Sequence, residues 1–66
     1  MMFGQFVEYK GHIGSIEYSA EDQIYFGQLL NIEDLVNYEG HSVEELYEYY
    51  REAVDTYIEF RKEIRV

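Results

Sequence analysis

The sequence predicts an α+β domain in which a three-stranded antiparallel sheet is covered by one long C-terminal helix. Short runs rich in β-branched and aromatic residues precede residue 40, and a capping signal stands at Ser42. After Ser42, apolar residues recur with the period of an α-helix. The chain has no proline and no low-complexity segment. Residues 1–66 are therefore expected to form a single domain.

The helix is predicted over residues 42–64. Ser42 followed by Glu45 is a capping box, in which each side chain accepts a hydrogen bond from the backbone N–H of the other residue. At about 100° per residue, one arc collects mostly apolar side chains. They are Val43, Leu46, Tyr50, Ala53, Val54, Tyr57, Arg61 and Ile64. The opposite arc is charged, so we expect the helix to lie on an apolar surface.

The three strands are predicted before the helix. Residues 6–19 form the first, interrupted by a bulge or kink at Gly11 and Gly14. Residues 20–23 make a hairpin turn, and residues 24–30 return with apolar side chains on both faces, as in a strand that is covered twice or lies in an oligomer. A turn at 31–34 precedes the third strand, at 35–39. A further short strand is allowed from Ile64 onward.

Length and composition predict self-association. A chain of 66 residues buries only about 60% of its unfolded surface, and this one has no cysteine for a disulfide or a thiolate metal site. Eight tyrosines and four phenylalanines make burial against a second subunit effective. We expect a homodimer or a higher homo-oligomer. The N-terminus has no signal-peptide pattern and no run is long enough to span a membrane, so a cytoplasmic location without membrane contact is expected.

The net charge of −9 constrains the partner. It disfavours binding to a nucleic-acid backbone, which requires clustered lysine and arginine. It favours a basic protein partner and fast, salt-sensitive association. The alternative is that the charge only keeps a surface helix soluble.

Catalytic chemistry has almost no support in the sequence. The carboxylate pairs Glu21-Asp22, Glu33-Asp34 and Glu44-Glu45 are adjacent in sequence and point apart on turns or helices. His12 and His41, the only histidines, are both expected in surface loops, too few for a zinc site. No serine has a histidine at a useful spacing. We therefore predict no enzyme activity, no metal and no cofactor.

Four side chains beside the core arc are candidate protein-interface residues. Tyr49 and Phe60 flank the arc on one side, and Tyr47 and Ile58 on the other, which widens the apolar sector to about half the helix. The tyrosine rings could simply lie flat on the rim of the sheet with their hydroxyls in water. Alternatively, part of the sector contacts a subunit or partner, because tyrosine is enriched at interface hot spots.

Most of the chain, residues 9–63, resembles the HicB family of antitoxins. The similar segments are residues 9–19, Glu21-Asp22, Phe26-Gly27, 34–40, 42–46 and 52–58. The resemblance implies a partial RNase H-like fold and an antitoxin of a type II toxin–antitoxin pair. Its partner would be a HicA-type toxin, a small basic ribonuclease that cleaves mRNA and that the antitoxin masks.

Two departures from the family limit what the resemblance implies. HicB proteins usually continue into a basic DNA-binding segment, whereas this sequence ends after Ile64-Arg65-Val66, so nucleic-acid binding by this domain is not expected. Gln23 stands in the hairpin where the family often has glycine. A stand-alone HicB-like oligomerisation or regulatory module without a toxin is the alternative. An RNase H-like enzyme is a third and weaker hypothesis, because no convergent acidic triad is evident.

Overall fold

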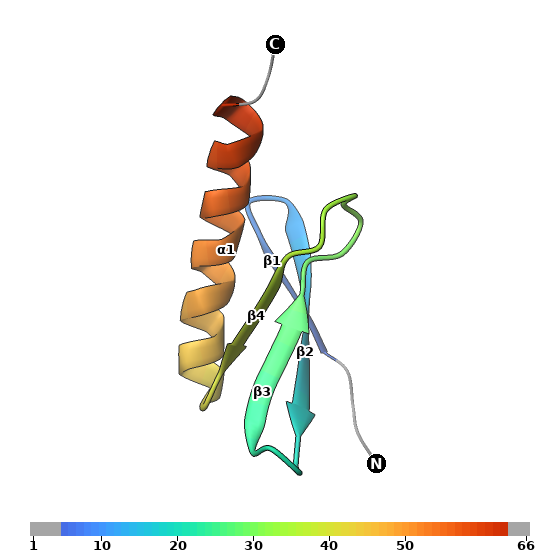
Figure 1. The fold of residues 1–66 in the computed structure, drawn as a ribbon, viewed down its shortest axis with the longest axis vertical. Coiled ribbons are helices and arrows are strands. Elements are labelled where there is room, and N and C mark those ends of the chain that lie inside the picture. Colours follow the sequence, from blue (N-terminus) through green and yellow to red (C-terminus); the bar gives the residue numbers. More distant parts are fainter. Residues whose placement is uncertain (1–4, 64–66) are drawn as a thin grey trace.

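The computed structural model describes residues 5–63, which form a four-stranded sheet and one helix (Figure 1). The elements are β1 (Gln5–Tyr9), β2 (His12–Ser19), β3 (Ile24–Gln28), β4 (Asn37–Gly40) and α1 (Val43–Glu63). The strands are antiparallel and follow the order β1-β2-β3-β4. The α+β class, the antiparallel sheet and the single C-terminal helix are thus confirmed. The further strand expected from Ile64 lies outside the described residues.

The sheet has four strands because the first predicted strand folds back on itself. Tyr9 pairs with His12, and the two residues between them, Lys10 and Gly11, have φ angles of 53° and 81°. Two consecutive positive φ angles define the type I′ turn that joins tightly paired strands. Gly11 therefore marks a hairpin and not a bulge. The Lys-Gly pair lacks the asparagine or aspartate that usually signals such a turn, which is why the sequence favoured a kinked strand.

The second hairpin agrees with the prediction. Ser19 pairs with Ile24, and residues 20–23 form the connecting loop. Gln23 has a φ of 54°, a left-handed conformation that glycine adopts more easily. The Ser19 hydroxyl accepts a hydrogen bond from the backbone N–H of Asp22 at 3.2 Å, which stabilises the loop.

In the centre of the sheet, side-chain hydroxyls form hydrogen bonds with backbone groups where the pairing of β2 and β3 is interrupted. Between the pairs Glu17–Phe26 and Gly14–Leu29, the Ser15 hydroxyl accepts a bond from the Gln28 N–H at 3.1 Å. The Tyr38 hydroxyl donates to the Ser15 carbonyl at 2.9 Å. Gly27 permits this approach, because a Cβ there would overlap the Ser15 carbonyl oxygen. Tyrosine thus takes part in the sheet's hydrogen bonding as well as in its core.

The core lies between the sheet and one arc of α1. Its buried members are Leu29, Tyr38, Leu46, Tyr50, Val54 and Tyr57. The helical ones follow the predicted spacing, and Tyr50 is only 1% exposed. Its hydroxyl donates to the His12 carbonyl at 2.7 Å, which ties the middle of α1 to β2. Among the described residues, no buried side-chain polar atom lacks a hydrogen-bond partner.

The start of α1 is capped largely as predicted. The Glu45 N–H donates to the Ser42 hydroxyl at 3.0 Å. The Glu45 carboxylate, however, accepts from the backbone N–H of His41 at 2.6 Å, one residue before the position that the capping box predicts. Farther along, Lys10 pairs with Asp55 at 2.9 Å and Arg61 approaches Asp34 at 3.9 Å. The predicted arc is wrong at its ends, since Val43 is 50% exposed and Arg61 is also exposed.

Candidate protein-interaction groove

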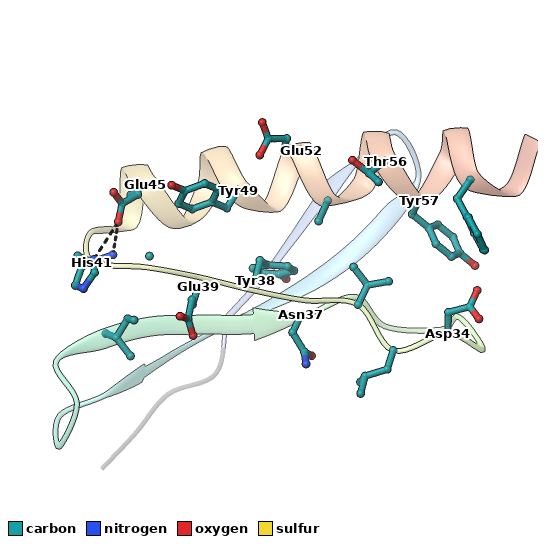
Figure 2. Close-up of a pocket in the computed structure, with 16 residues that line it drawn as sticks. Asp34, Asn37, Tyr38, Glu39, His41, Glu45, Tyr49, Glu52, Thr56 and Tyr57 are labelled. Atoms are coloured by element: carbon teal, nitrogen blue, oxygen red, sulfur yellow. Dashed lines mark hydrogen bonds and ion pairs between the residues drawn. The ribbon is translucent and has the colours of Figure 1, made fainter. Parts of the chain in front are cut away.

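A solvent-open groove of about 1140 Å³ runs between β4 and the adjacent flank of α1 (Figure 2). We call it the β4–α1 groove. All of β4 borders it, together with the preceding residues 34–36 and one flank of the helix from Glu45 to Phe60. In Figure 2, Tyr38 lies between β4 and α1, whereas Asn37 points away from the helix. The groove thus lies beside the last strand of the sheet.

Exposed apolar side chains line this groove. Tyr49 is 47% exposed, Phe60 is 50% exposed and Leu35 is 76% exposed. Tyr49, Ala53, Thr56 and Phe60 follow one another at spacings of four and three residues, which places them along one flank of α1. Large apolar groups exposed together, and not singly, are typical of an interaction surface.

The polar part of the groove is negatively charged. Asp34, Glu39, Glu45 and Glu52 belong to its lining, whereas no lysine or arginine is among the described lining residues. The His41 N–H that bonds the Glu45 carboxylate lowers the pKa of that group below its usual value, which keeps it ionised. The groove therefore suits a cationic partner.

The four predicted interface residues divide between two environments. Tyr49 and Phe60 line the β4–α1 groove. Tyr47 and Ile58, on the other flank, are half-buried and pack against the core, with the Arg51 guanidinium 5.0 Å from the Tyr47 ring centre. Sequence periodicity separated these two flanks but missed Leu35. That residue reaches the groove through the loop before β4, a long-range placement that helical spacing does not encode.

The described residues offer no arrangement suited to metal binding. No group of three or more histidine, cysteine, aspartate or glutamate side chains comes together within residues 5–63. His12 lies in β2 and not in a loop, and its ring contacts Tyr57 edge-on at 5.6 Å. The loop position predicted for His12 was therefore wrong, because the tight turn at Lys10-Gly11 extends β2 back to this residue. His41 does lie in a loop and is exposed.

The sheet face away from α1 also carries exposed apolar groups. Side chains alternate between the faces of a strand, and Tyr38 and Gly40 are the buried, helix-facing positions of β4. Phe26 pairs with Glu39 and so points to the opposite face. On this second surface Phe26 is 36% exposed, Ile13 is 39% exposed and Phe6 is 66% exposed.

Comparisons with other proteins identify no relative of this chain. It has no significant match among protein-family models, curated proteins or solved structures. Within the described residues, no helix is both long enough and apolar enough to cross a membrane.

Proposed function

We propose that this protein is a stoichiometric binding module of the HicB antitoxin type, which masks a basic, HicA-type ribonuclease. The observation that carries the proposal is the β4–α1 groove, in which exposed aromatic rings lie among four carboxylates. Asp34 lies 3.9 Å from Arg61, whereas Glu39, Glu45 and Glu52 form no ion pair with a lysine or arginine of the described residues. Aromatic groups at the centre of a contact supply binding energy, and charged groups around them supply specificity and speed.

The proposed partner follows from complementary chemistry. A ribonuclease must attract the phosphate backbone of its substrate and therefore presents lysine and arginine around its active site. An acidic protein that covers this surface competes directly with RNA. The chain would then act by occupying the toxin, without chemistry of its own and without binding nucleic acid itself.

The test uses a HicA-type toxin and measures both association and RNA cleavage. We expect one-to-one inhibition of cleavage and an association rate that falls as salt rises. The double variant Glu39→Gln/Glu52→Gln should associate more slowly. Its matched control is Glu48→Gln/Glu59→Gln, which removes the same charge from exposed positions outside the groove.

Two outcomes would count against this function. Absence of binding to any HicA-type protein encoded beside this chain would overturn it. Equal slowing by both double variants would show that net charge alone, and not the groove, guides association.

The second surface favours another candidate function, self-association into a small scaffold or regulatory oligomer. Phe6, Ile13 and Phe26 expose apolar groups on the sheet face away from α1, beside Glu8, Glu17 and Glu39, and a second copy could cover these apolar groups. Sedimentation of the wild type and of Phe26→Ser tests this candidate. A concentration-dependent dimer that is lost in the variant would support it, whereas a wild-type monomer at high concentration would exclude it.

A further inference from the structure

We propose that the open edge of β4 binds an extended basic segment of the partner as an added strand, with the segment's apolar side chains packed on α1. The inference deepens the proposed function, because it assumes the same basic partner and specifies how that partner binds. It rests on the backbone of β4, the apolar flank of α1 and the charge of the groove.

The alternating hydrogen-bond pattern between β3 and β4 shows which backbone groups of β4 have no partner within the sheet. The Leu29 N–H donates to the Val36 carbonyl at 3.0 Å, and in the β3–β4 register these two residues lie opposite each other. In an antiparallel pair, hydrogen-bonded and non-hydrogen-bonded positions alternate. Tyr38 and Gly40 therefore bond to β3, while the N–H and C=O groups of Asn37 and Glu39 point to the open edge.

The same edge is where the groove lies. Asn37 and Glu39 border it together with Tyr49, Ala53 and Phe60 of α1. A strand added to β4 would lie about 4.8 Å from it, and its side chains would alternate between the two faces of the sheet. One set would point to the α1 side, where the aromatic rings are exposed, and the other to the face that carries Glu39. The segment that fits has alternating apolar and basic residues.

Charge selects this occupant over a second copy of the chain. Antiparallel pairing of β4 with another β4 would bring Glu39 and its neighbouring carboxylates together across a two-fold axis. Like charges that face each other across a strand pair are destabilising. The lysine or arginine side chains of an added basic strand would instead lie on the face of Glu39, which has the opposite charge, at the edge of a groove that also contains Glu45 and Glu52.

The first experiment probes the backbone with a short capped peptide of alternating lysine and valine, whose binding is followed by fluorescence anisotropy. Two analogues carry N-methyl groups on alternate residues, one on the lysines and the other on the valines. Strand addition predicts that one analogue loses about tenfold or more in affinity and the other binds nearly as the parent. If N-methylation of the lysines weakens binding, the added strand is antiparallel, because residues that share the Glu39 face then bond directly to Asn37 and Glu39. If N-methylation of the valines weakens binding, the added strand is parallel. Equal effects of both analogues would overturn the proposal.

The second experiment removes the edge N–H from the protein. Glu39→Pro deletes a donor that does not serve β3, and proline is tolerated on edge strands with its nitrogen facing solvent. Glu39→Gln is the matched control, since it loses the charge but keeps the N–H. With folding checked by circular dichroism, we expect Glu39→Pro to bind the peptide at least about fivefold more weakly than Glu39→Gln. Wild-type affinity in Glu39→Pro would overturn strand addition, and if this variant does not fold, the N-methyl pair decides.

These arms separate the inference from the proposed function. A HicA-type toxin that binds Glu39→Pro as tightly as Glu39→Gln would leave the antitoxin proposal standing and overturn strand addition. If only one of the two N-methylated peptides loses affinity and no HicA-type toxin binds, strand addition would stand and the antitoxin proposal would be overturned. If the wild-type chain forms dimers and the Glu39→Pro variant does not, the β4 edge binds a second copy of the chain. That result would overturn the proposal of a basic partner segment at this edge.

Discussion

Tyr49 and Tyr50 are neighbours in sequence and lie in opposite environments. Tyr50 is 1% exposed, packs against Tyr38 with ring centres 5.3 Å apart, and donates its hydroxyl to the His12 carbonyl. Tyr49 is 47% exposed and lines the β4–α1 groove. A rotation of about 100° around the helix thus separates a residue that holds the fold together from one that is available to a partner.

The contrast shows how a small domain can divide its aromatic residues between stability and recognition. The buried Tyr38 and Tyr50 both donate their hydroxyls to backbone carbonyls, so these two rings fill the core without an unpaired polar group. The exposed rings lie among carboxylates, of which Glu39, Glu45 and Glu52 form no ion pair with a lysine or arginine of the described residues. The two sides of α1 should therefore respond differently to the same substitution.

Truncation of Tyr50 should have the largest effect. Tyr50→Ala removes a fully buried ring and the hydroxyl that links α1 to β2, so we expect a loss of about 4 kcal/mol in the free energy of unfolding. Urea denaturation followed by circular dichroism measures it. A loss below about 1 kcal/mol would mean that the helix does not depend on this contact.

Gly27→Ala should come next. The added methyl group would overlap the Ser15 carbonyl oxygen, a backbone atom that cannot rotate away. We expect a loss of about 3 kcal/mol, a large part of what a domain this small holds. Gly11→Ala is a useful comparison, since a Cβ there meets open space and only the positive φ is strained. If both variants unfold at the same urea concentration, the close approach of β2 and β3 is not a constraint.

Because of Tyr38, the stability of the fold should decrease at alkaline pH. Burial raises the pKa of Tyr38 to about 12 from the usual 10.0, so the folded state favours the protonated hydroxyl. The contribution of this protonated hydroxyl to the free energy of unfolding is fully present below pH 10. It decreases by roughly 2–3 kcal/mol as the pH rises toward 12.

Tyr38→Phe provides the check on this prediction. The variant should lose about 1 kcal/mol at neutral pH, because its hydroxyl no longer bonds Ser15, and should show a weaker decline above pH 10. Thermal melts across this range test both parts. An alkaline decline as steep as that of the wild type would assign the titration to other groups.

Loss of the helix cap should have a moderate effect. Ser42→Ala removes the acceptor for the Glu45 N–H, and we expect a decrease of about 1 kcal/mol in stability. Glu48→Ala, an exposed position within α1, is the control. Equal stability of Ser42→Ala and the control would show that water replaces the cap at no cost.

Tyr49→Ala should have the smallest effect on stability and a large one on binding. Since the ring is half exposed, we expect a loss of less than about 0.5 kcal/mol in the free energy of unfolding. Affinity for the basic partner should fall about tenfold or more, because exposed aromatic groups dominate such contacts. Tyr47→Ala, on the flank packed against the core, should instead lose more stability and less affinity. The reverse ranking would place the interaction surface on the other side of α1.

The sequence predicted the elements with strong local signals and missed those set by distant contacts. The capping residues and the apolar period of α1 gave its position, and the polar loop at 20–23 gave one hairpin. The turn at Lys10-Gly11 was missed because a lysine with positive φ has no local signature. The pairing gap that Ser15 and Tyr38 close, and the contribution of Leu35 to the groove, depend on residues far apart in the chain. The aromatic surplus pointed to an interface, but only the sheet order places the groove beside β4.

Residue-resolved amide hydrogen exchange, measured by NMR on the free chain and on its complex with a HicA-type toxin, tests recognition at the β4 edge most directly. In the free chain, the N–H groups of Asn37 and Glu39 should exchange quickly while those of Tyr38 and Gly40 are protected. In the complex, Asn37 and Glu39 should become protected as well. Unchanged exchange of these two amides in a saturated complex would contradict the account.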